Sequence, residues 1–207
     1  MFDGAIILAA GNGIRLRPST DYLTIPFINI DDVTLIQHQF NFINGHNIQS
    51  TVVSTKSSFL KFFDDIQDGT ILIINESNIN GEFIRTMIKE QIRGVWIVLC
   101  ADVLIDFDLD QLFHEYKKLN TIFAVTPMKS NKFATHKICK KESGWEFADH
   151  GDYILSGVSI INFDKITQQD NYDIESMWKK AMVDGQLSFI EVAPKTWKCY
   201  DKVSDLL

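Results

Sequence analysis

Short apolar runs alternate with segments of helical periodicity over the first two thirds of the chain. The runs are β-branched and nearly continuous, which is typical of strands buried on both faces: Ala5–Leu8, Thr51–Ser54, Thr70–Ile74, Val95–Leu99 and Ile122–Thr126. Helices are predicted between them at Thr34–Asn44, Phe59–Asp65, Glu82–Arg93 and Asp110–Leu119. Alternating strands and helices form parallel βαβ units. The pattern therefore predicts an α/β fold, a Rossmann-like doubly wound, mostly parallel sheet with helices on both faces.

The last third of the chain departs from this alternation. Ser156–Asn162 and Leu187–Val192 are predicted strands on either side of a predicted helix at Ile174–Val183. Mixed or antiparallel additions to the sheet are therefore expected there. We find no linker, repeat or low-complexity tract, so residues 1–207 are expected to form one domain.

The net charge of −7 argues against a broad surface for nucleic acid, because such a surface needs clustered Lys and Arg. An anionic ligand would have to be bound by a few positively charged residues at its own site. One basic cluster consists of Lys129, Lys132, Lys137, Lys140 and Lys141. The favoured interpretation of this cluster is a solvated loop or strand edge, and the alternative is a set of cations beside a phosphorylated substrate.

Three widely spaced cysteines predict neither a disulfide framework nor a zinc site. No stretch approaches the roughly 18 to 20 apolar residues that span a bilayer, and the N-terminus enters strand sequence without a basic leader. A cytoplasmic protein that does not bind membranes is therefore expected. The sequence does not indicate the oligomeric state.

The loop after the first strand is rich in glycine and arginine. Ligands of doubly wound sheets bind at the carboxyl ends of the strands, where this loop begins. The loop lacks a dinucleotide fingerprint, because Leu16 occupies the third glycine position, and it has no Gly-Lys-Ser/Thr of a P-loop. A structural turn with surface arginines remains one explanation. The other is a loop whose backbone N–H groups and arginine hold phosphate.

Residues 8–18, Leu-Ala-Ala-Gly-Asn-Gly-Ile-Arg-Leu-Arg-Pro, closely resemble the GxGTRLxP signature of nucleotidyltransferases that join a nucleoside triphosphate to a sugar 1-phosphate or phospho-alcohol. Residues 35–54, 98–104, 155–163 and 174–206 are similar to later segments of that family, in the same order. In length and layout the chain is similar to small members that act on N-acetylmuramate 1-phosphate or phosphocholine. The resemblance implies the nucleotide-diphospho-sugar transferase fold, Mg²⁺ as cofactor, and a triphosphate and a phosphorylated small molecule as substrates.

The resemblance also implies roles for individual residues. The triphosphate would be held by Ala9, Ala10, Gly11, Asn12, Gly13 and Arg15, with Arg15 and Asp102 as catalytic residues. Asp102 would be a metal ligand, Asn80 and Gly81 would line the base and sugar, and Gly157 would approach the acceptor. The second metal position falls on Asp201 in one alignment, which is favoured because oxygen suits magnesium, and on Cys199 in the other.

One expected part is missing. The family's lysine after the loop falls on Ile25, and Lys56 or a lysine of the basic cluster could replace it. The leading hypothesis is a magnesium-dependent nucleotidyltransferase that releases pyrophosphate and makes precursors of surface polysaccharide. The alternative is a catalytically degenerate homologue that binds nucleotide or serves regulation or assembly.

Overall fold

A computed structural model describes residues 1–11, 16, 24–63, 69–77, 81–129, 137–167, 172–200 and 203–206. Its helices are α1 (Leu35–Gly45), α2 (Glu82–Lys89), α3 (Leu109–Lys117) and α4 (Ile174–Val183), with short 3₁₀ helices at Ile25–Phe27, Ser57–Phe62 and Val203–Asp205. Its strands are β1 (Gly4–Leu8), β2 (Asn29–Ile30), β3 (Val33–Thr34), β4 (Thr51–Thr55), β5 (Thr70–Ile74), β6 (Val95–Cys100), β7 (Val103–Asp106), β8 (Phe123–Lys129), β9 (Lys137–Lys141), β10 (Gly144–Ala148), β11 (Tyr153–Asn162), β12 (Leu187–Phe189) and β13 (Thr196–Cys199).

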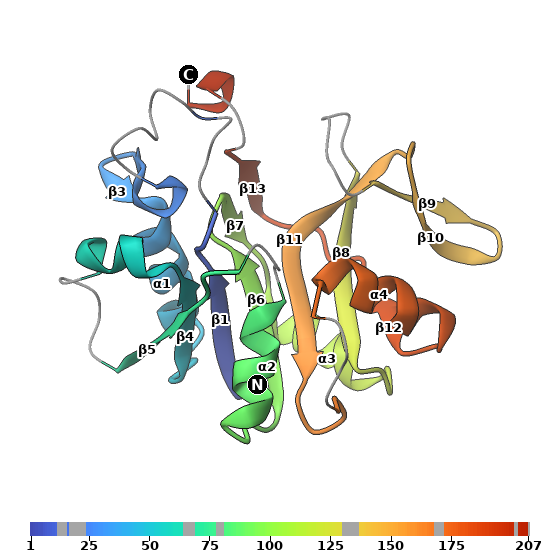
Figure 1. The fold of residues 1–207 in the computed structure, drawn as a ribbon. Helices are drawn as coiled ribbons and strands as arrows, with labels where there is room; N and C mark the ends of the chain where they lie inside the picture. The colour runs from blue at the N-terminus through green and yellow to red at the C-terminus, as the bar shows by residue number, and fades with distance from the viewer. Residues whose placement is uncertain are drawn as a thin grey trace.

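The central sheet contains nine of these strands (Figure 1). Strands β6, β1, β4 and β5 are parallel neighbours, with Leu8 level with both Ser54 and Cys100. Strand β11 is antiparallel to β6 on one side and to β8 on the other, and β12 extends the sheet parallel to β8. This arrangement confirms the mostly parallel α/β fold and the antiparallel additions in the last third. The prediction of one domain over residues 1–207 stays a prediction.

Helices cover both faces of the sheet (Figure 1). The side chains of α1 and α3, among them Phe40 and Leu112, are buried in one apolar core. Those of α2 and α4, including Phe83 and Trp178, are buried in a second core on the opposite face. Strands that lie between two cores are usually apolar on both sides, which explains the continuous apolar runs of β1 and β6.

Three helices begin at a residue whose side chain accepts a backbone N–H. Thr34 accepts from Gln37, Asp108 from Gln111 and Asp173 from Ser176. Such caps satisfy N–H groups that have no partner in the first helical turn. The side chain of Asp108 therefore serves as the cap of α3.

Several predicted elements differ from the structure. The predicted helix Phe59–Asp65 is wrong over its described residues, because residues 57–62 form a 3₁₀ helix with bonds such as Phe63 N–H to Leu60 O. Helix α2 ends at Lys89, and the chain then turns through positive φ at Gln91 and Gly94. Strand β5 is not buried on both faces, because it is an edge strand and leaves Ile71 55% exposed. Strand β12 ends three residues earlier than predicted.

Two small sheets stand beside the central one. Strand β7 pairs antiparallel with β13, and β2 pairs with β3. Neither pair was predicted. The β7–β13 pair places β13 beside the end of β6, because β7 follows β6 after two residues.

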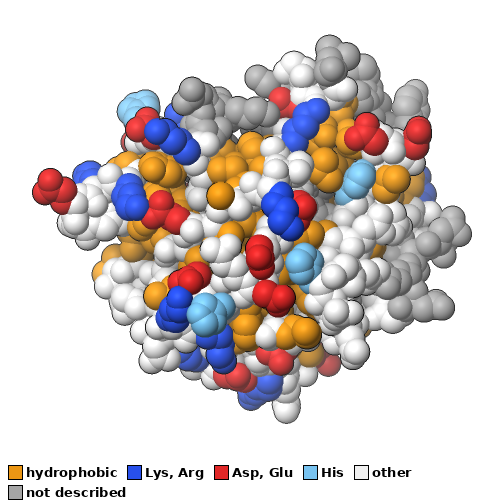
Figure 2. All heavy atoms as spheres, turned by 180° about the vertical axis from the view of Figure 1, so that it is seen from behind, with side chains coloured by type: hydrophobic (Ala, Val, Ile, Leu, Met, Phe, Trp, Pro, Cys, Tyr) orange, Lys and Arg blue, Asp and Glu red, His pale blue; other side chains and the backbone are white. Residues whose placement is uncertain are grey.

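Charged side chains of both signs are interspersed on the face shown in Figure 2, among the described residues. Within the described part of the chain, no helix is long and apolar enough to cross a bilayer.

Candidate nucleotide site

The carboxyl ends of β1, β4, β5 and β6 meet at one edge of the sheet, because these four strands are parallel. Backbone bonds continue the pairing past this edge. Ala9 N–H donates to Ser54 O at 2.8 Å, Ala101 N–H donates to Leu8 O at 3.2 Å, and Asn75 N–H donates to Thr55 O at 2.7 Å. The loops that follow these strands therefore start from fixed positions beside one another, as expected of a ligand-binding edge.

The glycine loop leaves the sheet between Ala9 and Gly11. Ala9 is buried, and its carbonyl lies 3.5 Å from the Oγ1 of Thr55. Ala10 is half-buried and Gly11 is exposed. No described atom lies within 4 Å of the place that a Cβ would take at Gly11, so described neighbours do not require glycine there. Farther along the chain, Leu16 is fully buried.

The central part of the predicted phosphate loop lies outside the described residues. This applies to Asn12, Gly13 and Arg15, and also to Asn80 in the second predicted loop and Asp201 near the C-terminus. Their predicted roles stay predictions.

Asp102 lies in the two-residue turn that joins β6 to β7, at the carboxyl edge, and it is half-buried. Its carbonyl accepts the backbone N–H of Tyr200 at 2.8 Å. This bond extends the β7–β13 pairing, in which Cys199 is level with Val103. The chain just before Asp201 is thus fixed beside the main chain of Asp102.

Two thiols accompany Asp102. Burial raises the pKa of the Cys100 thiol well above its ordinary value, and the charges of Asp102 and Cys199 act in the same direction. Cys100 and Cys199 are both half-buried, and neither forms a disulfide. A thiol that stays protonated is a poor ligand, and Mg²⁺ prefers oxygen.

Among the described residues, no group of three His, Cys, Asp or Glu could hold a metal ion. The carboxylate of Asp102 is one oxygen ligand of the kind that Mg²⁺ prefers. A complete magnesium site would need further oxygen ligands. Cys199 lies near enough to Cys100 to raise the pKa of its thiol, as does the charge of Asp102. Cys199 offers only sulfur. Asp201 remains the predicted source of a second carboxylate.

Two of the predicted site glycines have close neighbours. A Cβ on Gly81 would lie 2.0 Å from the carbonyl oxygen of Tyr172, so packing alone accounts for glycine at this position. Gly157 has a φ of +85°, and a Cβ there would lie 2.8 Å from Cγ2 of Val103 and 3.3 Å from Cβ of Cys100. The β11–β8 register shifts between Leu155 and Ser159, around this residue. The irregularity brings the β11 backbone against the turn that carries Asp102.

Residues around Gly157 tie β11 to its neighbours. The indole Nε1 of Trp197 donates to Ser156 O at 2.8 Å, and the hydroxyl groups of Ser156 and Thr126 are hydrogen-bonded to each other. Trp178 is buried in the core under α4, while Trp197 is only partly buried. Both indoles therefore have structural contacts.

The lysines of the basic cluster that the structure describes lie on β8 and β9. Lys140 forms an ion pair with Glu191, and Lys141 forms one with Glu146. This fits a solvated strand edge. Ile25, at the expected lysine position, begins a 3₁₀ helix. Lys56 follows β4 directly, at the same carboxyl edge as Asp102.

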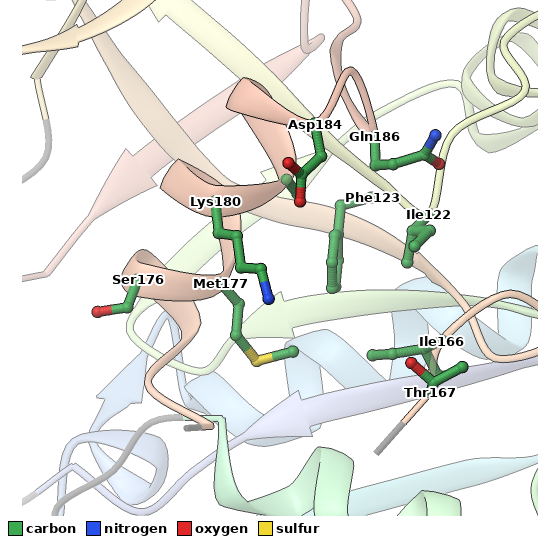
Figure 3. A pocket seen from close by; sticks show the side chains of 10 residues that line it. Ile122, Phe123, Ile166, Thr167, Ser176, Met177, Lys180, Asp184 and Gln186 are labelled. Carbon is green, nitrogen blue, oxygen red and sulfur yellow. The ribbon is translucent and has the colours of Figure 1, made fainter. Parts of the chain in front are cut away.

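A groove of about 450 Å³ lies at the opposite end of the sheet, between α4 and the start of β8 (Figure 3). Phe123 and Met177 form part of its wall, and the Lys180 side chain reaches over it. Phe123 is level with Ile161, which in turn is level with Trp96 near the amino end of β6. The groove is therefore separate from the edge that carries Asp102.

Residues 4–135, more than half of the chain, match a family model described as nucleotidyl transferase. The chain is 30% identical over 112 residues to the bifunctional protein GlmU of Methanococcus maripaludis, and 28% identical over 99 residues to the choline-phosphate cytidylyltransferase of Streptococcus pneumoniae. These matches cover 53% and 45% of this chain and 27% and 42% of the relatives. The chain thus spans less than half of the length of either relative.

Solved structures share the fold. A protein described as a glucose-1-phosphate thymidylyltransferase of Bacillus anthracis has a TM-score of 0.79 at 15% identity, with 98% of this chain and 92% of that chain covered. The inositol-1-phosphate CTP transferase of T. maritima has a TM-score of 0.75 at 18% identity, with coverage of 100% and 92%. At these identities the likeness shows the fold, and the sequence match adds the family. The chain belongs to the nucleotidyl transferase family.

Proposed function

We propose that the chain transfers a nucleotidyl group from a nucleoside triphosphate to a sugar 1-phosphate or phospho-alcohol and releases pyrophosphate. The observation that carries this proposal is the position of Asp102 at the carboxyl edge of a nucleotidyl transferase fold. Its turn is bonded to the end of β1, where the glycine loop starts, and the flanking residues Cys100 and Val103 lie against Gly157. The named activities of the relatives, on phosphocholine, glucose 1-phosphate and inositol 1-phosphate, define the acceptor class to be tested.

In the proposed reaction an acceptor phosphate oxygen attacks the α-phosphorus, so the protein must align two anions and neutralise their charge. The backbone N–H groups of residues 11–13 and the Arg15 guanidinium are assigned to the triphosphate. Mg²⁺, held by Asp102 and Asp201, would supply positive charge at the phosphates when bound. Lys56 is assigned the role of the missing lysine, because it follows a parallel strand at the same edge. We place the reaction in the cytoplasm, as a source of surface polysaccharide precursors.

The test is pyrophosphate release with each common nucleoside triphosphate against sugar 1-phosphates, inositol 1-phosphate and phosphocholine. Asp102→Asn should lower turnover by about 10²-fold or more, the size of losing one electrostatic contact to the transition state. Asp110→Asn is the matched control, because Asp110 is exposed on α3, and it should retain activity. Equal turnover in the two variants would refute the role of Asp102.

The second metal position is tested in the same assay. If Asp201 is a ligand, Asp201→Asn should require more Mg²⁺ for half-maximal turnover, while Cys199→Ser should not. The reverse result would assign the position to Cys199 and remove the proposed second carboxylate.

A catalytically degenerate homologue is the second candidate. Ile25 in place of a lysine favours it, since loss of one charged phosphate contact costs about 1.5–3 kcal/mol. Calorimetry distinguishes the candidates: nucleotide binding without turnover for any pair of substrates would favour the degenerate homologue.

A further inference from the structure

The turn that carries Asp102 is held through its main chain from three directions. Ala101 N–H donates to Leu8 O on β1, and Asp102 O accepts from Tyr200 N–H next to β13. The third contact comes from helix α1 on the face of the sheet. The side-chain amide of Gln39 donates to Val103 O and lies 3.4 Å from Cys100 O. One amide group therefore spans the turn, with Asp102 between the two carbonyls that it contacts.

Gln39 is unusual among the inward-facing residues of α1. It is 2% exposed, and the other buried residues of the helix are apolar: Leu35, Ile36, Phe40 and Ile43. Its Oε1 atom is buried and has no hydrogen-bond partner among the described residues. A buried unpaired acceptor is unfavourable, so an apolar side chain would suit the core better. The benefit of the amide lies at the turn, because without it the carbonyls of Cys100 and Val103 would lose a hydrogen-bond donor.

We propose that Gln39 is a positioning residue for Asp102: it fixes the β6–β7 turn so that the carboxylate is presented at the carboxyl edge of the sheet. This inference rests on the proposed function, in which Asp102 holds the metal. It adds a residue of α1 that does not touch substrate. Residues that orient a metal ligand from behind commonly change metal affinity without contacting the ion.

The experiment compares Gln39→Met, which keeps size and removes the donor, with Gln37→Met, the same substitution on the exposed side of α1. Ile43→Val serves as a control for loss of core stability, because Ile43 is fully buried on the same helix. The first measurement is the affinity for Mn²⁺ in the presence of nucleotide, which electron paramagnetic resonance detects. We expect Gln39→Met to bind Mn²⁺ about 10–100-fold more weakly than wild type, and both controls to change it by less than about threefold.

The second measurement needs neither metal nor activity. Hydrogen exchange of the Ala101 and Tyr200 amides, measured by NMR, reports on the turn itself, because both N–H groups donate hydrogen bonds that hold the turn. Exchange should accelerate in Gln39→Met and stay near the wild-type rate in the controls. If Gln39→Met does not fold, Gln39→Asn takes its place, because it keeps the amide but withdraws it by one methylene.

The outcomes separate the two proposals. Faster exchange with weaker Mn²⁺ binding supports the role of Gln39. Mn²⁺ affinity and exchange that match the Ile43→Val control overturn it, whether or not Asp102→Asn is inactive. If wild type binds no Mn²⁺ and shows no turnover, the proposed function fails, and the exchange rates alone decide whether Gln39 fixes the turn.

Discussion

Replacing Gly157 by alanine adds one methyl group where β11 crosses the turn that carries Asp102. Two separate costs are expected. The backbone φ of +85° is unfavourable for any residue with a Cβ, and the new Cβ would lie 2.8 Å from Cγ2 of Val103. Left-handed backbone costs about 1–2 kcal/mol, and an extra methyl in a filled core costs about 1–3 kcal/mol. The free energy of unfolding should therefore fall by about 2–5 kcal/mol.

Three other glycines separate these costs. Gly185 has a φ of +68° with open space around it, so Gly185→Ala should show the backbone cost alone, about 1–2 kcal/mol. Gly81 lacks the positive φ but would place a Cβ 2.0 Å from the backbone oxygen of Tyr172, which cannot move aside as a side chain can, so Gly81→Ala should show a packing cost alone, of about 3 kcal/mol or more. Gly45, at the end of α1, has neither feature, and Gly45→Ala should change stability by less than about 1 kcal/mol.

The assay is urea unfolding, monitored by tryptophan fluorescence, of the four variants and wild type. The reasoning requires that Gly157→Ala is more destabilising than Gly185→Ala by at least about 1 kcal/mol. Equal losses would mean that the β11 backbone does not approach Val103 closely. The proposed contact between β11 and the Asp102 turn would then be refuted.

Two further predictions concern groups that hold the sheet together. Burial raises the pKa of the Tyr116 phenol, whose hydroxyl donates to Thr121 O at 2.7 Å. The unfolded chain therefore ionises first as the pH rises past about 10. The free energy of unfolding should fall there in wild type and fall less in Tyr116→Phe, as measured by urea unfolding at neutral pH and about pH 10.5; an identical fall in both proteins would contradict this assignment. Trp197→Phe removes the bond to Ser156 O and should cost about 0.5–1.5 kcal/mol in the same measurement at neutral pH, and an unchanged urea midpoint would show that the bond contributes nothing.

The middle of the central sheet could be predicted because its strands are buried on both sides. A strand between two cores has few polar residues, so β1 and β6 appear in the sequence as short continuous apolar runs. The β7–β13 pair has no such signal. Its strands are four residues long and only partly buried, and each finds its partner far away in the sequence. Pattern alone could not identify either strand.

The candidate site has weaker signals in the sequence than the sheet has. Asp102 follows a strongly apolar run, and a resemblance to family sequences assigns it a role. Gln39 gave no signal, because one polar residue on an amphipathic helix is normally assigned to the solvent side. Its contact with Cys100 joins residues 61 positions apart, which only the folded chain brings together.

The bond from Tyr200 N–H to Asp102 O has a consequence for how the protein is made. Synthesis runs from the N-terminus, so β1 and β6 can pair while the last third of the chain is still missing. The main chain at Asp102 gains its last donor only after residue 200 has left the ribosome. A nascent chain that already holds most of the sheet would therefore still lack one of the main-chain bonds that fix the Asp102 turn, and it would gain that bond only when β13 pairs with β7.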